Sequence, residues 1–561
     1  MFLPTTRQEL DELSWDRLDV LLVTGDSYID SPFIGIAIIG RLLAQAGYRV
    51  GVIAQPDMTS ATDITRLGEP TLFWGVSAGS IDSMVANYTA TRKRRKQDDY
   101  TPGGVNDRRP DRAVIAYCNL IRRYFKDTRP LVLGGIEASL RRVAHYDFWS
   151  DKIRRSILFD AKADALLYGM AERSVIELAE RLKAGRDFDD VRGLCYIARE
   201  RRADYLVLPS YEDVAQDKQA FIEMFHTFYR NNDPLTAQGL CQQHGARYLV
   251  QNPPAPYLAQ GELDAVYALG FERDVHPFYR AQGEVRALDT IKFSIATHRG
   301  CYGECNFCAI AVHEGRTVRW RSQASILAEA RHLTTHPDFK GYILDVGGPT
   351  ANMYGYECQK KLAHGVCDGR RCAYPEICPQ LKVDHAPQIE LLQALRRLEG
   401  VKKVFVASGI RYDLLLADQA HGGAYLTEVV GHHVSGQMKI APEHTQEHLL
   451  HRMGKPGQAP LLAFRELFYK ATQAAGKPQF LTYYLIAAHP GCTEGDMVQL
   501  RAFASRELKI NPEQVQVFTP TPSTYSSLMY YTELDPFTGE PLFVEKDLAR
   551  KERQKRIMGK K

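Results

Sequence analysis

The sequence lacks any segment that would carry the chain into or across a membrane. It contains no uncharged run of membrane-spanning length, and its first residues, Met1-Phe-Leu-Pro-Thr-Thr6, do not form a charged segment followed by a long apolar core. We therefore expect a cytoplasmic protein. In that compartment the eleven cysteines are expected to be reduced thiols or metal ligands rather than disulfides.

A strong charge of either sign is also missing. The 71 lysines and arginines are nearly balanced by 67 acidic residues, which leaves a net charge of +4 over 561 residues. Such a balance does not indicate a nucleic-acid-binding protein. The hydrophobic content of 45% and the charged content of 25% are ordinary for a globular protein. The length predicts roughly two to four domains.

Short apolar runs alternate with helical patterns in residues 1–204. The runs read as strands at 18–24, 48–54, 71–77, 131–133 and 165–168. Strands that alternate with helices predict a parallel, doubly wound sheet with a ligand crevice at the carboxyl ends of its strands. Residues 205–289 are less regular, and we interpret them as a connecting segment.

Two groups of charged residues in this first region each have two interpretations. The runs Arg92-Lys-Arg-Arg-Lys96 and Arg108-Arg-Pro-Asp-Arg112 form either a solvated face or a clamp for phosphate, in RNA or in a small substrate. Glu137 and Arg141 follow a predicted strand. They either stabilise the first turns of a helix or line the crevice.

Six strand–helix units follow in residues 290–522. The strands are predicted at 291–296, 342–346, 403–407, 437–440, 480–486 and 515–518. In β/α barrels the active site lies at the carboxyl ends of the strands. Residues 523–561 form a basic tail, for which we predict a surface helix with a fraying end.

Three cysteines lie close together directly after the first of these strands, in Gly300-Cys-Tyr-Gly-Glu-Cys-Asn-Phe-Cys308. Thiolates at this density favour zinc or an iron–sulfur cluster. A closed zinc site or an ordinary [4Fe–4S] cluster uses four protein ligands, so a cluster held here would keep one iron open. The alternative is a structural zinc site with His298 or His313 as its fourth ligand.

The cysteine spacing resembles the signature of the radical S-adenosylmethionine (SAM) superfamily, Cys-x3-Cys-x-aromatic-Cys, with Phe307 at the aromatic position. The resemblance implies a [4Fe–4S] cluster on Cys301, Cys305 and Cys308 whose open iron binds SAM. An external one-electron reductant, such as a flavodoxin or ferredoxin, would then drive cleavage of SAM to methionine and a 5′-deoxyadenosyl radical.

The same resemblance suggests further SAM contacts. Gly347 and Gly348, in Asp345-Val-Gly-Gly-Pro349, resemble the glycine pair that holds the SAM amino group, because only glycine lets a ligand approach the main chain so closely. Arg411 is the candidate for the SAM ribose or carboxylate. Segments 439–444, 453–456 and 488–494 resemble parts of radical SAM methylthiotransferases, although helix capping and surface charge would equally explain Glu443 and Glu494.

A second group of cysteines lies in an insertion at residues 351–386. It consists of Cys358, Cys367, Cys372 and Cys378. Four cysteines are enough for a closed second site, either structural zinc or an auxiliary cluster. The spacing contains no pair of Cys-x2-Cys knuckles, and reduced thiols without a metal are the other interpretation.

The N-terminal region resembles the cobalamin-binding-like domain that precedes many radical SAM barrels. The matching segments are Pro32-Phe-Ile-Gly35, Gly134-Gly135 and Tyr168-Gly-Met-Ala-Glu172. The Asp-x-His-x-x-Gly motif that would supply a cobalt ligand is missing, so we expect no bound cobalamin. The predicted fold is thus α/β, a doubly wound N-terminal domain followed by an open radical SAM (β/α)6 barrel.

Segments along nearly the whole chain resemble the bacterial YgiQ-type radical SAM family. They are Arg109-Pro-Asp-Arg112, Gly134-Gly-Ile-Glu-Ala-Ser-Leu-Arg-Arg142, Gly347-Gly-Pro-Thr-Ala-Asn-Met-Tyr-Gly355 and Glu552-Arg-Gln-Lys-Arg556. This resemblance implies the cofactor but not the substrate. We expect hydrogen abstraction from an RNA or another macromolecule. The alternatives are an enzyme acting on a small metabolite and a non-catalytic iron–sulfur sensor or scaffold.

Overall fold

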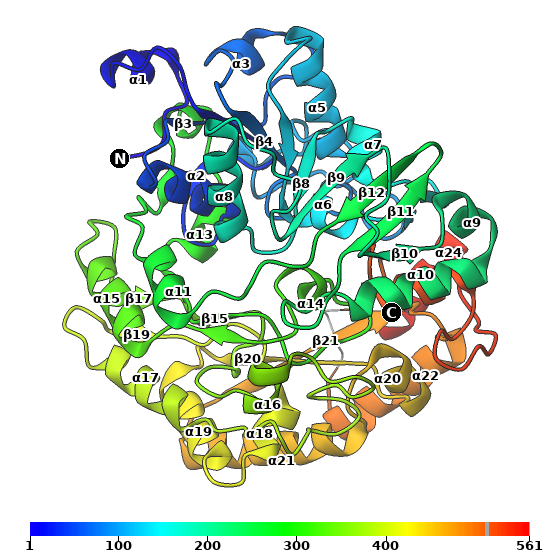
Figure 1. The fold of residues 1–561 in the computed structure, drawn as a ribbon. Coiled ribbons are helices and arrows are strands. Elements are labelled where there is room, and N and C mark those ends of the chain that lie inside the picture. Colours follow the sequence, from blue (N-terminus) through cyan, green and yellow to red (C-terminus); the bar gives the residue numbers. More distant parts are fainter. Residues whose placement is uncertain (511–514, 560–561) are drawn as a thin grey trace. The chain divides into compact units, whose positions relative to one another are not determined.

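The computed structural model describes residues 1–510 and 515–559, and the chain divides into two compact units. Unit 1 comprises Met1–Tyr257 and Ala265–Lys292, and unit 2 comprises Leu258–Asp264 and Phe293–Lys561 (Figure 1). Residues 511–514 of the predicted barrel and 560–561 of the predicted tail lie outside the described residues.

Unit 1 is built on a nine-stranded sheet within the described part of the chain. In spatial order its strands are β10 (Leu206–Leu208), β11 (Leu240–His244), β12 (Arg247–Gln251), β9 (Leu194–Ala198), β8 (Ala165–Leu167), β5 (Leu131–Leu133), β4 (Phe73–Ser77), β1 (Val20–Thr24) and β3 (Val50–Ala54). The strands from β3 to β8 are parallel, as predicted. β9 and β12 then join antiparallel.

The extended sheet differs from the predicted domain division. Residues 205–289 were expected to connect two domains, but β10, β11 and β12 add strands to the sheet of unit 1. The turn at Gly245 folds β11 back onto β12, and β12 pairs with β9. Backbone hydrogen bonding along these strands therefore makes residues 206–251 part of the first unit.

Helices flank the strands of unit 1 (Figure 1). They are α1 (Arg7–Glu12), α2 (Gly35–Gln45), α3 (Thr62–Thr65), α4 (Ser83–Asn87), α5 (Ala113–Tyr124), α6 (Gly135–Leu140), α7 (Ile157–Ala161), α8 (Glu172–Lys183), α9 (Tyr211–Gln216), α10 (Lys218–Arg230), α12 (Pro277–Arg280) and α13 (Ala287–Ile291), with α11 (Gln260–Tyr267) where the chain passes between the units. Two short strand pairs complete the unit, β2 (Ile29–Asp30) with β13 (Asp274–Val275), and β6 (His145–Asp147) with β7 (Lys152–Arg154).

Unit 2 contains strands at the six places that the sequence predicts. They are β14 (Ser294–Ala296), β17 (Tyr342–Ile343) continued by β18 (Asp345–Gly347), β19 (Lys403–Val404), β20 (Gln437–Glu443), β21 (Phe480–Ala487) and β22 (Val515–Val517). The pairs β14–β18, β17–β19, β20–β21 and β21–β22 are parallel, and a parallel bridge joins Ile410 to Ile440. The first strand begins at Ser294 rather than at residue 291, because α13 continues through Ile291.

The helices of unit 2 lie around the outside of these strands (Figure 1). They are α14 (Ile310–His313), α15 (Gln323–Thr334), α16 (Gln359–His364), α17 (Ala386–Arg396), α18 (Tyr412–Ala417), α19 (Gly422–Glu428), α20 (Glu447–Met453), α21 (Gln458–Ala474), α22 (Glu494–Phe503), α23 (Tyr525–Thr532) and α24 (Leu548–Met558). A two-stranded pair of β15 (His298–Arg299) and β16 (Arg319–Trp320) follows the first strand.

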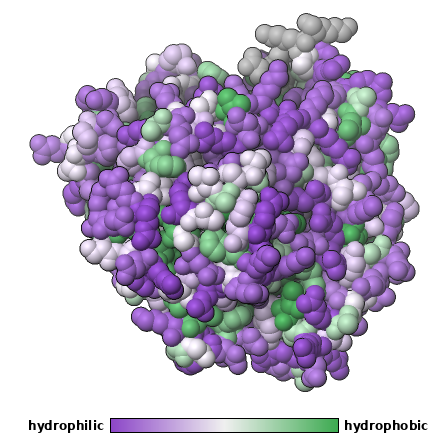
Figure 2. Space-filling model, turned by 90° about the horizontal axis from the view of Figure 1, so that it is seen from above, coloured by the Kyte–Doolittle hydropathy of each residue, from purple (hydrophilic) through white to green (hydrophobic). Residues whose placement is uncertain are grey.

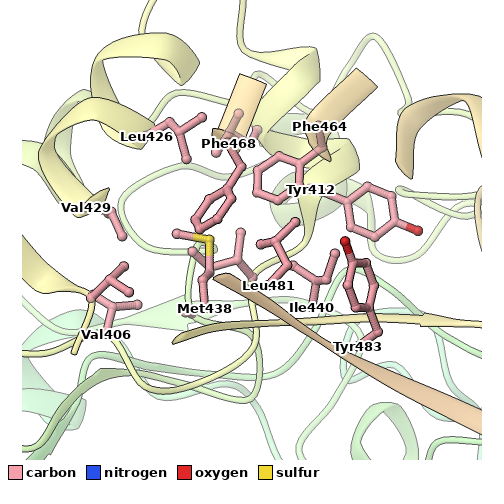
Figure 3. Packing of buried hydrophobic residues seen from close by; sticks show 14 of the residues in the cluster. Val406, Tyr412, Leu426, Val429, Met438, Ile440, Phe464, Phe468, Leu481 and Tyr483 are labelled. Atoms are coloured by element: carbon pink, nitrogen blue, oxygen red, sulfur yellow. The ribbon is translucent and has the colours of Figure 1, made fainter. Parts of the chain in front are cut away.

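A hydrophobic core joins these helices to the strands. Phe464 and Phe468 of α21 pack against Met438 of β20 and Leu481 of β21, all of them buried (Figure 3). Full burial of each such side chain stabilises the fold by about 1.5–3 kcal/mol. This packing holds the strands in place, and the strands in turn fix where their carboxyl ends lie.

The C-terminal helix is packed rather than free on the surface. In α24 the side chains of Lys551, Gln554 and Met558 are at most 2% exposed. Gln554 accepts a hydrogen bond from the Ala488 amide at 2.8 Å and donates one to the Cys492 carbonyl at 3.1 Å. The predicted helix is therefore present with one face packed, since these polar side chains bind the backbone that follows β21, while Arg550, Arg553 and Lys555 are exposed.

The face seen in Figure 2 is mostly hydrophilic, with hydrophobic residues in small separate patches. Among the described residues, no helix combines the length and the apolar character needed to span a lipid bilayer.

Candidate functional site

The cysteine loop of unit 2 begins directly after β15 and is held by distant parts of the same unit. The amide of Gly300 donates to the Glu314 carboxylate at 3.0 Å. On the other side, Asn306 donates from its backbone to the Met453 carbonyl at 2.9 Å, and its carbonyl accepts from the Ser526 amide at 2.9 Å. The loop is therefore fixed by three separate segments.

The three thiols of the loop lie in a partly buried, polar environment. The Gly303 amide donates to Cys301 Sγ at 3.3 Å, and Thr350 Oγ1 lies 3.7 Å from the same sulfur. Burial and the neighbouring thiols raise the pKa values of Cys301 and Cys308. Three thiolates held together in this way require a cation or a metal core to remain charged.

The spread of the sulfurs distinguishes a cluster from a single ion. Tetrahedral zinc with Zn–S bonds of about 2.3 Å would bring its sulfurs to within about 4 Å of one another. Among the described residues, the group of three ligand atoms that all lie within 4.8 Å of one another is Asp384, Asp418 and His421, and no such group includes these cysteines, His298 or His313. Within the described residues, the loop therefore lacks the close approach of sulfurs and ring nitrogens that a single tetrahedral zinc ion requires.

The predicted glycine pair lies beside the cysteine loop. Gly347 ends β18 next to Ala296 of β14. A Cβ on Gly348 would lie 2.5 Å from Nε2 of His298, so a larger residue would displace that buried ring. Asp345 joins this strand to the next, because its carboxylate accepts from the Ala407 amide at 2.8 Å and from the Ser408 amide at 3.1 Å.

Arg411 also reaches the cysteine loop, but with a partner that the sequence analysis missed. Its guanidinium pairs with both carboxylate oxygens of Asp413, with Nε 3.0 Å from Oδ1, and Nη1 faces Cys305 Sγ at 3.9 Å. Burial raises the pKa of Asp413, but the Arg411 guanidinium outweighs it and keeps that pKa below its ordinary value. The Arg-x-Asp spacing after the third strand was the available signal.

A second buried charged pair follows β20. Glu443 is 8% exposed, and Lys455 Nζ lies 3.9 Å from its carboxylate. Burial raises the pKa of Glu443, and the positive charges of Lys455 and Arg411 partly offset this increase. Surface charge therefore does not explain Glu443, whereas Glu494 is half-exposed at the start of α22 and pairs with Arg553.

The aromatic residue of the signature, Phe307, is half-buried within the cysteine loop.

Unit 1 has its own charged group at its strand ends. The strand order reverses between β1 and β4, the position at which doubly wound sheets form a crevice. There the buried guanidinium of Arg109 lies 2.8 Å from Asp26, 3.0 Å from Asp98 and 2.7 Å from the Ala78 carbonyl. Arg109 and its partners Asp26 and Asp98 therefore occupy the predicted crevice position with ion pairs between side chains of unit 1.

The other charged residues of unit 1 also have internal partners. Arg112 pairs with Asp147 at 2.7 Å, and Arg141 pairs with Asp82. Glu137 accepts hydrogen bonds from the Ser83 amide at 2.8 Å and from the Val114 amide at 3.2 Å. These contacts favour the structural interpretation of Glu137 and Arg141.

Comparison with known proteins relates these features to a family. The sequence model of the radical SAM N-terminal family matches residues 2–294. A UPF0313 protein of Fusobacterium nucleatum is 58% identical over 561 residues, covering 100% of this chain and 99% of the relative. A UPF0313 protein of Thermotoga neapolitana is 48% identical over 558 residues, covering 99% and 98%. The class is thus that of the radical SAM proteins. Within it the chain belongs to the UPF0313 family, which confirms the resemblance to the YgiQ-type proteins.

Solved structures share the fold at low sequence identity. The radical SAM methyltransferase TsrM from Kitasatospora setae, with cobalamin and a [4Fe–4S] cluster bound, matches with a TM-score of 0.51 and 16% identity over 91% of this chain and 74% of that one. TsrM with its tryptophan substrate and a SAM analogue matches with a TM-score of 0.50 and 14% identity over 90% and 75%. At this identity the likeness is one of fold.

The prediction about cobalamin was wrong. It relied on the missing Asp-x-His-x-x-Gly motif, which would supply a ligand to cobalt. A solved protein of similar fold nevertheless holds cobalamin together with a [4Fe–4S] cluster. The absence of that one motif therefore does not separate this chain from cobalamin-binding proteins.

Proposed function

We propose that this protein is a radical SAM enzyme that holds a [4Fe–4S] cluster on Cys301, Cys305 and Cys308 and cleaves SAM reductively. The observation that carries the proposal is the position of the cysteine loop after the first parallel strand, where Thr350 Oγ1 lies 3.7 Å from Cys301 Sγ and Arg411 Nη1 lies 3.9 Å from Cys305 Sγ. When bound and reduced by an external flavodoxin- or ferredoxin-like protein, the cluster supplies the electron that splits SAM into methionine and a 5′-deoxyadenosyl radical.

The residues of the chain position and protect this chemistry. The Gly303 amide donates to Cys301 Sγ, and Arg411 Nη1 faces Cys305 Sγ, so both groups direct hydrogen-bond donors at the sulfurs that would hold the cluster. We assign SAM contacts to Phe307, Gly347, Gly348 and Arg411. Since Asp413 occupies Nε and Nη2 of Arg411, Nη1 is the atom that remains directed toward the cysteine loop.

The domain layout that goes with this function follows the strand order. We infer that the six parallel strands of unit 2 form an open radical SAM barrel and that unit 1 is the doubly wound N-terminal domain.

The radical then abstracts a hydrogen atom from the substrate. We retain RNA or another macromolecule as the substrate class, with a small metabolite as the alternative. A non-catalytic iron–sulfur sensor would instead bind a cluster without cleaving SAM, so the first experiment addresses cleavage itself.

The test is anaerobic reconstitution with iron and sulfide, followed by dithionite and SAM, with 5′-deoxyadenosine measured by mass spectrometry. We expect the product with the wild type and background amounts with Cys305→Ala. Cys118→Ala removes a buried thiol of unit 1 and should retain the activity. Equal product from the wild type and Cys305→Ala would contradict the proposal, and a cluster-bearing wild type without any product would favour the sensor.

A further inference from the structure

All four cysteines of the insertion line one cavity in unit 2. The cavity has a volume of about 270 Å³, and its walls include Cys358, Cys367, Cys372 and Cys378. These residues are separated along the chain by eight-, four- and five-residue gaps, so chance alone would not direct all four to one space. None of them forms a disulfide.

The backbone of the insertion explains how the cysteines meet. Cys358 directly precedes α16. The Cys378 amide donates to the Cys372 carbonyl at 2.8 Å, and an antiparallel bridge between Ala373 and Ile377 closes a tight hairpin. The helix start and the hairpin thus form opposite parts of the cavity wall.

Positive charge surrounds the same cavity. Lys360, Lys361, Arg370 and Arg371 also line it. Lys361 is only 3% exposed, and its Nζ lies 3.6 Å from Cys372 Sγ and 3.7 Å from the Glu304 carboxylate. A buried ammonium is costly unless anions compensate it. Four thiolates around a metal core carry a net negative charge, so the lysine and the thiols are electrostatically complementary.

The spread of the sulfurs selects the kind of metal centre. Among the described residues, no three of these thiols lie within 4.8 Å of one another, which is wider than tetrahedral zinc requires. The three signature cysteines likewise form no group within 4.8 Å of one another among the described residues. A cube of four irons and four sulfides holds its thiolate ligands farther apart than a single ion does.

We propose that Cys358, Cys367, Cys372 and Cys378 hold a second, four-cysteine [4Fe–4S] cluster. It lies beside the signature loop: Arg371 donates to the Glu304 carbonyl at 2.9 Å, and Lys361 Nζ lies 5.6 Å from the centre of the Tyr302 ring. Since four cysteines complete its coordination, this cluster is closed to SAM. The proposal does not rest on the chemistry assigned to the signature cysteines.

The experiment counts iron and sulfide in the full-length protein after anaerobic reconstitution, with Mössbauer spectroscopy of ⁵⁷Fe-loaded samples. Two four-iron clusters predict about eight irons per chain in the wild type. The triple variant Cys301→Ala, Cys305→Ala, Cys308→Ala and the double variant Cys372→Ala, Cys378→Ala should each retain about four irons. The matched control Cys118→Ala, which removes a buried thiol of unit 1, should retain all of them.

The iron counts test the two cluster sites separately. A wild type with about four irons, all lost in the triple variant, would overturn the second cluster while leaving the proposed function intact. Stoichiometric zinc retained by the triple variant, with no iron, would also overturn it. Circular dichroism of each variant identifies misfolding, and the Mössbauer count of the wild type decides the question if a variant does not fold.

Discussion

Each unit of this protein buries an arginine at the carboxyl ends of parallel strands, and the two arginines have different neighbours. Arg109 in unit 1 is enclosed by two carboxylates and a carbonyl. Arg411 in unit 2 has one carboxylate, on Asp413, and turns Nη1 toward the thiol of Cys305. The buried arginine of unit 1 thus contacts only carboxylates and a carbonyl, whereas that of unit 2 also faces a thiol of the cysteine loop.

The difference teaches how a buried charge can be interpreted. A buried ion whose hydrogen-bonding groups are all satisfied by its own unit contributes mainly to structure, and removing it leaves uncompensated partners. A buried ion that faces a reactive group also tunes the chemistry of that group. Four substitutions test this distinction, from the largest expected effect to the smallest.

Arg109→Met should produce the largest loss of stability. It leaves Asp26 and Asp98 buried without their cation, and breaking a buried pair costs about 3–5 kcal/mol. Guanidinium unfolding followed by tryptophan fluorescence measures the effect, because Trp15, Trp74 and Trp149 belong to unit 1 and only Trp320 to unit 2. A loss below about 1 kcal/mol, which is the range of exposed ion pairs, would contradict the role of Arg109 as a buried stabilising charge.

Arg411→Met should reduce SAM cleavage by about 10–100-fold, since hydrogen bonds to charged groups contribute about 1.5–3 kcal/mol. The double variant Arg411→Met, Asp413→Leu removes the uncompensated carboxylate as well. We expect it to recover the free energy of unfolding but not the rate of 5′-deoxyadenosine formation. Recovery of both would show that Arg411 is structural in the same sense as Arg109.

His145→Gln should alter the acid sensitivity of unit 1 alone. Burial, assisted by the Arg141 charge, lowers the pKa of His145 from 6.5 to about 3. The unfolded chain therefore takes up the proton first, so stability is complete above pH 6.5 and is lost as the pH falls toward 3.

At pH 5 this proton uptake costs the wild type about 2 kcal/mol, which the glutamine variant avoids. Fluorescence-detected unfolding at neutral pH and at pH 5 measures the difference. In unit 2, burial lowers the pKa of His489 to about 3 in the same way. His489→Gln is therefore the matched substitution in unit 2. An unchanged acid dependence in His145→Gln would contradict the assignment of a neutral, buried imidazole.

Arg94→Ala should have the smallest effect. Arg94 belongs to the same basic segment as Arg109, but its ion pair with Asp111 is exposed, with side-chain exposures of 45% and 40%. Such pairs contribute less than about 1 kcal/mol. A loss comparable to that of Arg109→Met, in the same unfolding assay, would show that burial does not decide the role of charge in this segment.

The sequence predicted the parts of the fold whose apolar residues follow a clear period. The strand order of unit 2 and the cysteine loop after its first strand were predicted because short apolar runs alternate with helical patterns there. Strands β11 and β12 were missed, since their buried faces include polar residues. Gln242 accepts from the Ala144 amide and Gln251 from the Arg142 guanidinium, so these glutamines take apolar positions in the pattern.

The same reason explains why the packing of the C-terminal helix was not predicted. The buried face of α24 includes Lys551 and Gln554, and no apolar period marks it in the sequence. In the candidate site, the residue types could be predicted from the sequence, but the direction of each side chain depends on tertiary packing. The orientation of Arg411 toward Cys305 and the burial of Glu443 beside Lys455 could be learned only from the folded unit.

The distant supports of the cysteine loop have a consequence for the order of assembly. The Asn306 side chain donates to the Arg452 carbonyl across a sequence separation of 146 residues, and the Ser526 amide contacts the same residue from still farther along the chain. During synthesis the loop emerges from the ribosome long before these supports exist, and contacts between distant residues form late in folding. If the signature cysteines hold the cluster proposed above, iron would reach them only after synthesis, and the three thiols would need protection from oxidation until the last helices have folded.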